Sequence, residues 1–312
     1  MRVLIAAIHY PVASGRYAAE AFRRLGADVR TIGSSTGNKI WGMEVAPHYA
    51  WRSDGELTKH WEDWTPDIVV VMESAYAYHH PYYAAIPHVI WGVDNHVRNY
   101  EQPGIARYFL GHNAVSIQPF TEDVEWLPCA YDPTVFTPSP IAWDDREYDV
   151  ALVGVNYQQR AQVMTAMDKA GLKVLYGTGF IYDQYRDIYH NAKVALSVSA
   201  AHDVAQRIFE TAAMGCAVLT DELPDLAALN PQGITTFNSV EDAVSKAQKL
   251  VKNGAKQAAA GQAWALPHTW DARAARIMDW WQDTYAPKPK RKAKIESKPE
   301  TTNEDAAGEA AK

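Results

Sequence analysis

Short apolar runs recur along the chain, and each is followed by a polar loop and then by a longer mixed segment. The runs at 3–8 (VLIAAI) and 68–72 (IVVVM) contain no polar residue, which is typical of parallel strands buried on both faces. The first run leads through a loop into 16–26 (RYAAEAFRRLG), a predicted helix that stops at its final glycine. Because a further strand is expected at 28–32, this order predicts an α/β fold.

The rest of the first half continues the same pattern. Further strands are predicted at 88–91, 107–110, 114–117 and 124–127, and a helix at 56–64. The segment WLPCAYDPTVFTPSP then interrupts the pattern, because proline cannot continue a regular element. We therefore expect a domain boundary near residue 140.

The second half repeats this plan in architecture but not in sequence. Strands are predicted at 150–153, 172–176, 194–198, 217–220 and 233–237, and helices at 158–170, 183–192, 204–214, 239–251 and 269–285. The chain is therefore expected to form two Rossmann-like β/α/β domains, residues 1–140 and 141–268. The tail at 287–312, rich in Lys, Pro, Glu and Thr, is predicted to be disordered.

Composition narrows the class of protein. The 312 residues are 47% hydrophobic and 21% charged, enough for two globular domains. The net charge of −7 gives no electrostatic reason to expect a nucleic-acid or membrane surface. Cys129 and Cys216 have no CxxC spacing, no apolar run approaches the roughly 20 residues of a membrane span, and no signal pattern opens the chain. We expect a cytoplasmic protein with reduced cysteines and no membrane partner.

Polar residues follow the predicted strands of the first half, at the edge where ligands bind in open α/β sheets. Ser14 and Gly15 close the loop after the first strand, which is neither a GxGxxG fingerprint nor a P-loop, and we expect them to help bind a cofactor. Asp94 and His96 follow the strand at 88–91, where either can act as general base on a hydroxyl. The alternative for Asp94 is a turn or N-cap, which Asp favours.

The loop after the strand at 68–72 is aromatic. Glu73 precedes AYAYHHPYY, which can face an acceptor or can pack as ordinary core. His79 and His80 are adjacent and no third ligand has metal spacing, so no metal site is expected.

The most suggestive chemistry lies in the second half. Arg207 and Glu210 are three residues apart on the helix predicted at 204–214, so both emerge on one face near its start. An Arg at a helix start after a strand suits a diphosphate, and a Glu one turn on suits a ribose diol. The alternative is an intrahelical ion pair on a solvated face. Other candidates for cofactor binding follow the preceding strands: Gly154, Asn156, Arg160 and Gly177.

Several motifs together resemble a known family. They are IWGVDN at 90–95, LPCAYDPTVFTP at 127–138, VALVGVNYQQR at 150–160, QRIFETAAMGCAVLTDE at 206–222 and LPHTWDARAARIM at 266–278. The chain resembles GT-B glycosyltransferases, most closely the CgeB-like, spore-maturation type and more distantly the retaining family 4. The resemblance implies two domains facing a cleft, with the helix at 269–285 crossing back to the first domain.

The resemblance also implies a reaction and roles for residues. The donor would be a nucleoside diphosphate sugar, a UDP-sugar first of all, with Glu210 on its ribose and Arg207 on its diphosphate. Family 4 enzymes carry a second Glu at the position of His202, so His202 or Asp203 is expected to touch the sugar and the stereochemistry stays open. The chain has no DxD motif, which favours a metal-independent mechanism.

The acceptor is left open between a glycan, a small molecule and a modified, hydroxylated base of phage DNA. Residues 1–140 carry 10 Lys and Arg against 15 Asp and Glu, a poor surface for duplex DNA. The alternative to an enzyme is a non-catalytic sugar-nucleotide-binding or coat-assembly protein with the same fold. Nothing in the sequence indicates an oligomeric state.

Overall fold

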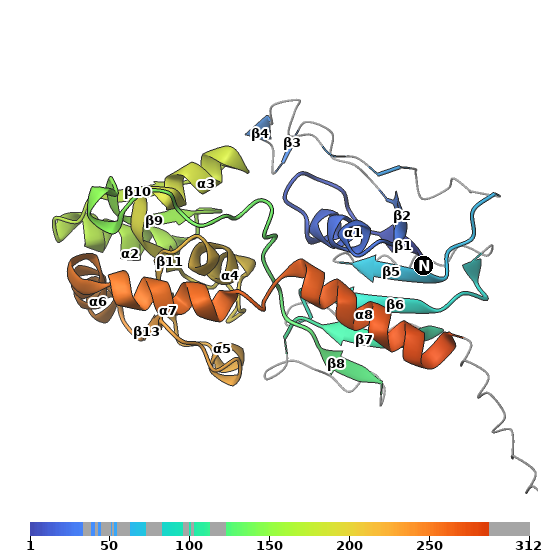
Figure 1. Cartoon of the computed structure of the whole chain (residues 1–312). Helices are drawn as coiled ribbons and strands as arrows, with labels where there is room; N and C mark the ends of the chain where they lie inside the picture. The colour runs from blue at the N-terminus through green and yellow to red at the C-terminus, as the bar shows by residue number, and fades with distance from the viewer. Residues whose placement is uncertain are drawn as a thin grey trace, which may run out of the picture.

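A computed structural model describes residues 1–33, 39–40, 43–44, 51, 53–54, 63–72, 83–95, 100, 103–112 and 123–286. Within this part the chain forms two parallel sheets side by side, each with its own helices (Figure 1). We call the first sheet with helices α1 and α8 the first lobe, and the second sheet with helices α2 to α7 the second lobe. This arrangement confirms the expected α/β fold.

The first sheet has six strands in the order β2-β1-β5-β6-β7-β8, all parallel. The strands are β1 Arg2–Ala6, β2 Asp28–Ile32, β5 Ile68–Met72, β6 His88–Gly92, β7 Ile105–Leu110 and β8 Val124–Trp126. Helix α1, Ser14–Arg24, follows β1, and β3 (Lys39–Ile40) and β4 (Met43–Glu44) form a short antiparallel pair. The strand expected at 114–117 lies outside the described residues, as does the helix expected at 56–64 except for residues 63 and 64, which are not helical.

The second sheet has five parallel strands in the order β10-β9-β11-β12-β13. They are β9 Tyr148–Val153, β10 Val174–Gly177, β11 Ala192–Ser197, β12 Ala217–Asp221 and β13 Ile234–Phe237. Its helices are α2 Gln158–Lys169, α3 Asp183–His190, α4 Gln206–Ala213, α5 Pro224–Ala228, α6 Val240–Asn253 and α7 Ala255–Ala265. Helix α7 was not expected, because its alanine-rich sequence has no clear apolar stripe.

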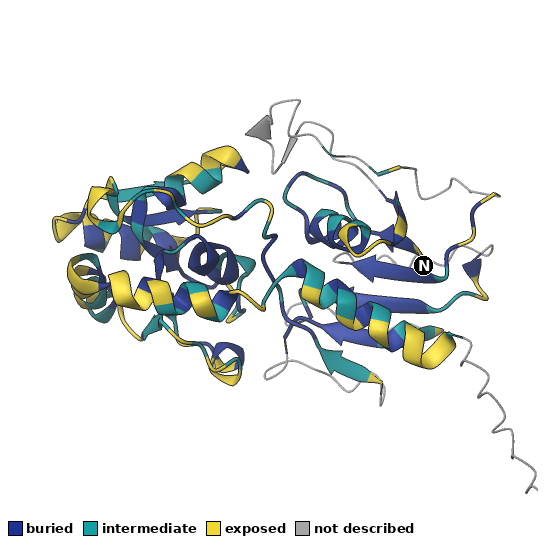
Figure 2. Cartoon of the chain, in the orientation of Figure 1, coloured by how far each residue is buried: buried dark blue, intermediate teal, exposed yellow. Residues whose placement is uncertain are grey.

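Alternation along the strands explains why both faces of the second sheet are covered. Val150 and Leu152 pack with α2 and α6, whereas Ala151 and Val153 belong to the core on the side of α3 and α4. The central strands are consequently buried over most of their length (Figure 2). This is the reason that their sequences read as continuous apolar runs.

The last helix returns to the first lobe. Helix α8, Trp270–Tyr285, begins at the N-cap Thr269, whose hydroxyl accepts a hydrogen bond from the Ala272 amide, and it packs against α1. Arg24 of α1 donates to Asp271 at 2.6 Å, and Trp281 donates to the Asp67 carbonyl. The expected crossing of the C-terminal helix is therefore confirmed. None of the helices in the described part of the chain is both long and apolar enough to cross a bilayer.

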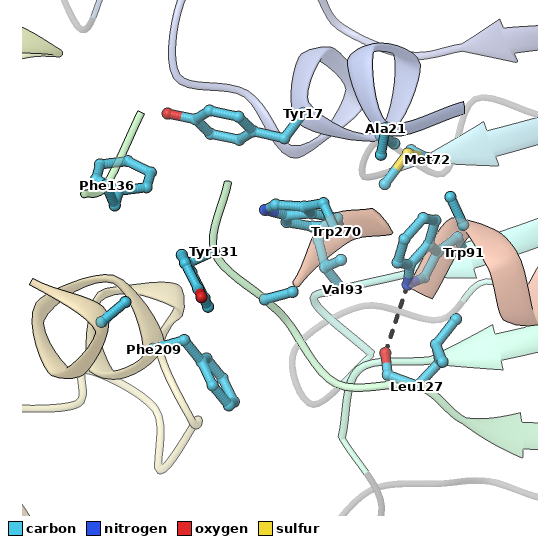
Figure 3. Packing of buried hydrophobic residues seen from close by; sticks show 14 of the residues in the cluster. Tyr17, Ala21, Met72, Trp91, Val93, Leu127, Tyr131, Phe136, Phe209 and Trp270 are labelled. Atoms are coloured by element: carbon cyan, nitrogen blue, oxygen red, sulfur yellow. Dashed lines mark hydrogen bonds between the residues drawn. The ribbon is translucent and has the colours of Figure 1, made fainter. Parts of the chain in front are cut away.

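The segment between β8 and β9, residues 127–147, is called the interlobe connection. One hydrophobic cluster runs through both lobes and through this connection. Trp270 of α8 lies 5.1 Å from the Trp91 ring and 6.2 Å from the Tyr17 ring, and Phe136 of the interlobe connection lies 6.0 Å from Tyr17 (Figure 3). Phe136 in turn meets Tyr185 of the second lobe at 5.8 Å. Aromatic packing therefore fixes how the two lobes meet.

Candidate functional site

A cavity of about 300 Å³ lies where the two lobes meet. The first lobe contributes Val12 and Tyr17, and the connection contributes Phe136. The carboxyl ends of β9 and β10 supply the rest together with residues of α3 and α4. Most of the lining is apolar. Its polar side chains in the second lobe include Thr178, Tyr185, Gln206, Arg207 and Glu210.

Arg207 is the cation of this cavity. It lies in the first turn of α4, and its Nε and Nη1 atoms are buried without a hydrogen-bond partner in the described part of the chain. Gly154 leaves room for it, since a Cβ on Gly154 would lie 2.5 Å from the Arg207 Nη2 atom. Buried guanidinium donors that the protein leaves unmet can be satisfied by an anionic ligand.

Arg160 lies beside Arg207, but two of its five guanidinium N–H donors already bond backbone carbonyls. Its Nε donates to the Val198 carbonyl at 2.9 Å and its Nη1 to the Val155 carbonyl at 3.0 Å, so it links the ends of β11 and β9. Burial and the neighbouring Arg207 charge lower its pKa. Arg160 thus shapes the loop that holds Arg207, and its expected contact with a phosphate stays a prediction.

Glu210 is buried at the same cavity, and its carboxylate accepts two hydrogen bonds. The Tyr185 hydroxyl donates to Oε2 at 2.7 Å, and the Gln206 side-chain amide donates to Oε1 at 2.6 Å. Burial raises the pKa of Glu210, and these two hydrogen bonds and Arg207 oppose that shift. The alternative of a solvated Arg207–Glu210 ion pair is therefore wrong, because Glu210 is 6% exposed and its partners are Tyr185 and Gln206.

Four other expected cofactor contacts lie near the cavity without lining it. Gly15 packs α1 onto the chain after β1, where a Cβ would meet the Ala7 Cβ at 2.5 Å, and Ser14 is buried beside it. Gly177 lies under the Phe180 ring, which does line the cavity, and Asn156 accepts a hydrogen bond from the Tyr176 hydroxyl at 2.6 Å.

Of the expected catalytic residues, Asp94 and His202 are described and do not line this cavity. Asp94 lies in the turn after β6, next to Asn95, whose side chain bonds both the amide and the carbonyl of His112. His96, Glu73 and loop residues 76–82 lie outside the described residues. His202 is exposed and lines a separate hollow of about 410 Å³ with Ser199 and Asp221.

His202 has a left-handed backbone, with φ of 60°. The turn that holds it is closed by the Ser199 hydroxyl, which donates to Asp203 Oδ1 at 2.6 Å and accepts from the Asp203 amide. Left-handed backbone at a residue other than glycine is uncommon and is often found at functional sites.

Tyr17, Phe136 and Tyr185 line the cavity although they were not among the residues expected at the site. They come from α1, the interlobe connection and α3, which are far apart along the chain. Only Phe136 fell within a family-like motif. No group of three or more His, Cys, Asp or Glu side chains in the described residues is placed to hold a metal ion.

The chain is similar to known proteins both in sequence and in fold. The sequence profile of a family described as "Glycosyl transferase-like" matches residues 140–279, which hold the second sheet and the start of α8. No curated protein matches the chain.

Several solved structures share the two-lobed fold. HepE from Anabaena, in complex with UDP, has a TM-score of 0.62 at 11% identity over 91% of this chain and 100% of its own. AviGT4, a glycosyltransferase involved in avilamycin A biosynthesis, has 0.55 at 14% identity over 89% and 97%. A Listeria monocytogenes protein assigned as a UDP-N-acetylglucosamine 2-epimerase has 0.52 at 10% identity over 92% and 99%. At these identities the likeness shows the fold alone, and the fold of this chain is GT-B.

Proposed function

We propose that this protein transfers a glycosyl group from a nucleoside diphosphate sugar to an acceptor hydroxyl, with the donor bound in the interlobe cavity. The observation that carries the proposal is the pair of buried Arg207 nitrogens that have no partner in the described part of the chain. A diphosphate supplies the charge and the acceptor oxygens that these donors require. The glycosyl transferase-like match over residues 140–279 supports the reaction type.

Stabilising the leaving nucleoside diphosphate is the main electrostatic task of such a transfer. Arg207 and the amino end of α4 can do this without a metal ion, because both present positive charge to one side of the cavity. Glu210 then takes the ribose diol, and the apolar rim at Phe180 and Ile181 takes the base. UDP is the first nucleotide to test, since the similar HepE was crystallised with it.

The remaining roles follow from the family-like motifs. We propose kinship with the CgeB-like enzymes, a domain boundary at residue 140, and Asp94 or His96 as general base. A sugar contact by His202 stays a prediction from the resemblance alone, because His202 lines a separate hollow and not the interlobe cavity. Glycans, small molecules and hydroxylated DNA bases stay the candidate acceptors. Binding of a sugar nucleotide without transfer would favour the non-catalytic alternative.

A binding experiment tests the donor site. Titration calorimetry with UDP is expected to show binding that weakens at least about 10-fold in Arg207→Gln, since a charged hydrogen bond is lost. Arg186→Gln is the matched control, because Arg186 pairs with Asp183 on α3 and does not line the cavity. Equal UDP affinity in Arg207→Gln and the control would contradict the assignment of the donor site to the cavity at Arg207.

A turnover experiment tests the reaction. Incubation with UDP-sugars and a panel of acceptors, followed by mass spectrometry, should show a product heavier by one glycosyl residue. Release of UDP with no glycosylated product, or isomerisation of the sugar, would contradict transfer.

A further inference from the structure

The Glu210 carboxylate is held from two sides before any ligand arrives. Tyr185 of α3 donates to one oxygen at 2.7 Å, and Gln206 of α4 donates to the other at 2.6 Å. Each carboxylate oxygen has two lone pairs, so within the described part of the chain one acceptor position remains on each oxygen. Two free positions, one on each oxygen, match two neighbouring hydroxyl groups.

Packing fixes the direction from which Tyr185 donates. Its ring lies 4.7 Å from the Tyr189 ring of the same helix and 5.8 Å from the Phe136 ring of the interlobe connection. A tyrosine held on two sides cannot swing away without disturbing the interlobe cluster. The orientation of the Glu210 carboxylate is therefore tied to the packing of the lobes.

We propose that Tyr185 and Gln206 are positioning residues that present Glu210 to a vicinal diol, and so make the cavity selective for ribonucleoside over 2′-deoxyribonucleoside diphosphates. This inference rests on the proposed function. A deoxyribose has a single ring hydroxyl to offer and leaves one buried acceptor position of Glu210 unmet. A site built to bond a hydroxyl discriminates strongly against the analogue that lacks it.

The same contacts favour the ionised form of Glu210. The titratable groups that face it are Arg207 on its own helix, Tyr17 of α1, and Tyr185 and Tyr189 of α3. Burial raises the pKa of Glu210, whereas hydrogen bonds from Tyr185 and Gln206 lower it. Loss of either donor is expected to raise this pKa further, so the carboxylate takes up a proton at a higher pH.

The test compares UDP with 2′-deoxy-UDP by titration calorimetry on the full chain between pH 5.5 and 8. We expect the wild-type protein to prefer UDP by at least about 10-fold at pH 8. In Tyr185→Phe the UDP affinity should fall roughly 10-fold and the preference should narrow, because a carboxylate of Glu210 that is no longer held in place forms weaker hydrogen bonds to the diol. The loss of UDP affinity on acidification should also begin at a higher pH than in the wild type.

Tyr189→Phe is the control. It removes a buried hydroxyl from the same helix, but that hydroxyl accepts from the Val153 amide and does not bond Glu210. This variant should keep the wild-type preference and pH profile, whatever stability it loses. If Tyr185→Phe does not fold, Gln206→Leu replaces it, because Gln206 donates to the other Glu210 oxygen. The same fall in UDP affinity and the same narrowing of the preference are expected.

Two results separate the possible failures. If the wild type binds UDP and 2′-deoxy-UDP equally, or if Tyr185→Phe and Gln206→Leu keep the wild-type preference, the positioning role is wrong and the proposed donor site still stands. If the wild type binds neither of these nucleotides nor the diphosphates of guanosine, adenosine and thymidine, the proposed function fails and this inference fails with it.

Discussion

The Tyr182 hydroxyl donates a hydrogen bond to the Pro11 carbonyl oxygen, so the second lobe touches the first lobe beside the cavity. Arg16 strengthens this contact: it donates to the same carbonyl at 2.9 Å, and its guanidinium lies 4.5 Å from the centre of the Tyr182 ring. Tyr182 has a positive φ of 46°, a strained backbone for a tyrosine. The two lobes are thus joined at the cavity by a contact separate from the aromatic cluster.

Replacing Tyr182 by Phe is expected to weaken this junction. Loss of one buried hydrogen bond should lower the free energy of unfolding by about 1 kcal/mol, measured by urea denaturation. Tyr285→Phe is the control, because Tyr285 is exposed at the end of α8. Unchanged stability in Tyr182→Phe would show that the contact does not hold the lobes together.

Replacing Gly154 by Ala is expected to displace Arg207. The added Cβ would lie 2.5 Å from Arg207 Nη2, and the backbone has a φ of 156°. UDP affinity should therefore fall at least about 10-fold, together with a stability loss of about 1–3 kcal/mol from backbone strain. Titration calorimetry and urea denaturation measure the two effects.

Gly171→Ala is matched to that variant. Its φ of 83° is also strained for Ala, but a Cβ there meets no atom within 4 Å. It should lose stability while keeping the wild-type affinity for UDP. A similar loss of affinity in both variants would mean that strain alone, and not the position of Arg207, explains the result.

Replacing Phe136 by Ala is expected to loosen the interlobe cluster. Phe136 is 4% exposed and contacts both Tyr17 and Tyr185, so truncation leaves a void between the lobes. The free energy of unfolding should fall by about 3–5 kcal/mol by urea denaturation, and Phe136→Leu should lose much less. A loss below about 1 kcal/mol would mean that the lobes repack without this ring.

The pH dependence of stability is expected to have a component from His268. Burial and the nearby Arg273, which lies 2.9 Å from His268 Nδ1, lower the pKa of His268 to about 4. Since the unfolded histidine titrates near its ordinary 6.5, the unfolded state binds the proton first. Stability should therefore decrease as the pH falls from 6.5 toward 4.

His268→Phe tests this component. The substitution keeps a ring against Phe209 and Trp264 but removes the titration. Its melting temperature should depend less on pH between 6.5 and 4 than that of the wild type. If the melting temperature of His268→Phe depends on pH as strongly as that of the wild type, the acid sensitivity comes from other groups. His9 is one of them, because burial lowers its pKa to about 4 as well.

The sequence predicted the sheets better than the site. Strand β5 is buried on both faces and consists only of apolar residues, so its apolar run identifies it directly. Arg207 and Glu210 were predicted to lie together, because the i, i+3 spacing in a helix puts both on one face, and both line the cavity.

The parts of the site that were missed depend on tertiary contacts. The hydrogen bond from Tyr185 to Glu210 joins residues 25 apart, and no local pattern marks Tyr185 as its donor. Similarly, no pattern in the sequence shows that Arg160 donates hydrogen bonds to two backbone carbonyls. Nor does any pattern show that His202 lines a hollow separate from the interlobe cavity.

The cavity has walls from both lobes, and this limits how the protein can be divided. A fragment with only the second lobe would retain Arg207 and Glu210 but would lack Val12 and Tyr17 on the opposite side. Water would then reach the guanidinium and the carboxylate and compete with any nucleotide for them. Such a fragment should accordingly fail to bind a nucleotide tightly even if it keeps its own sheet.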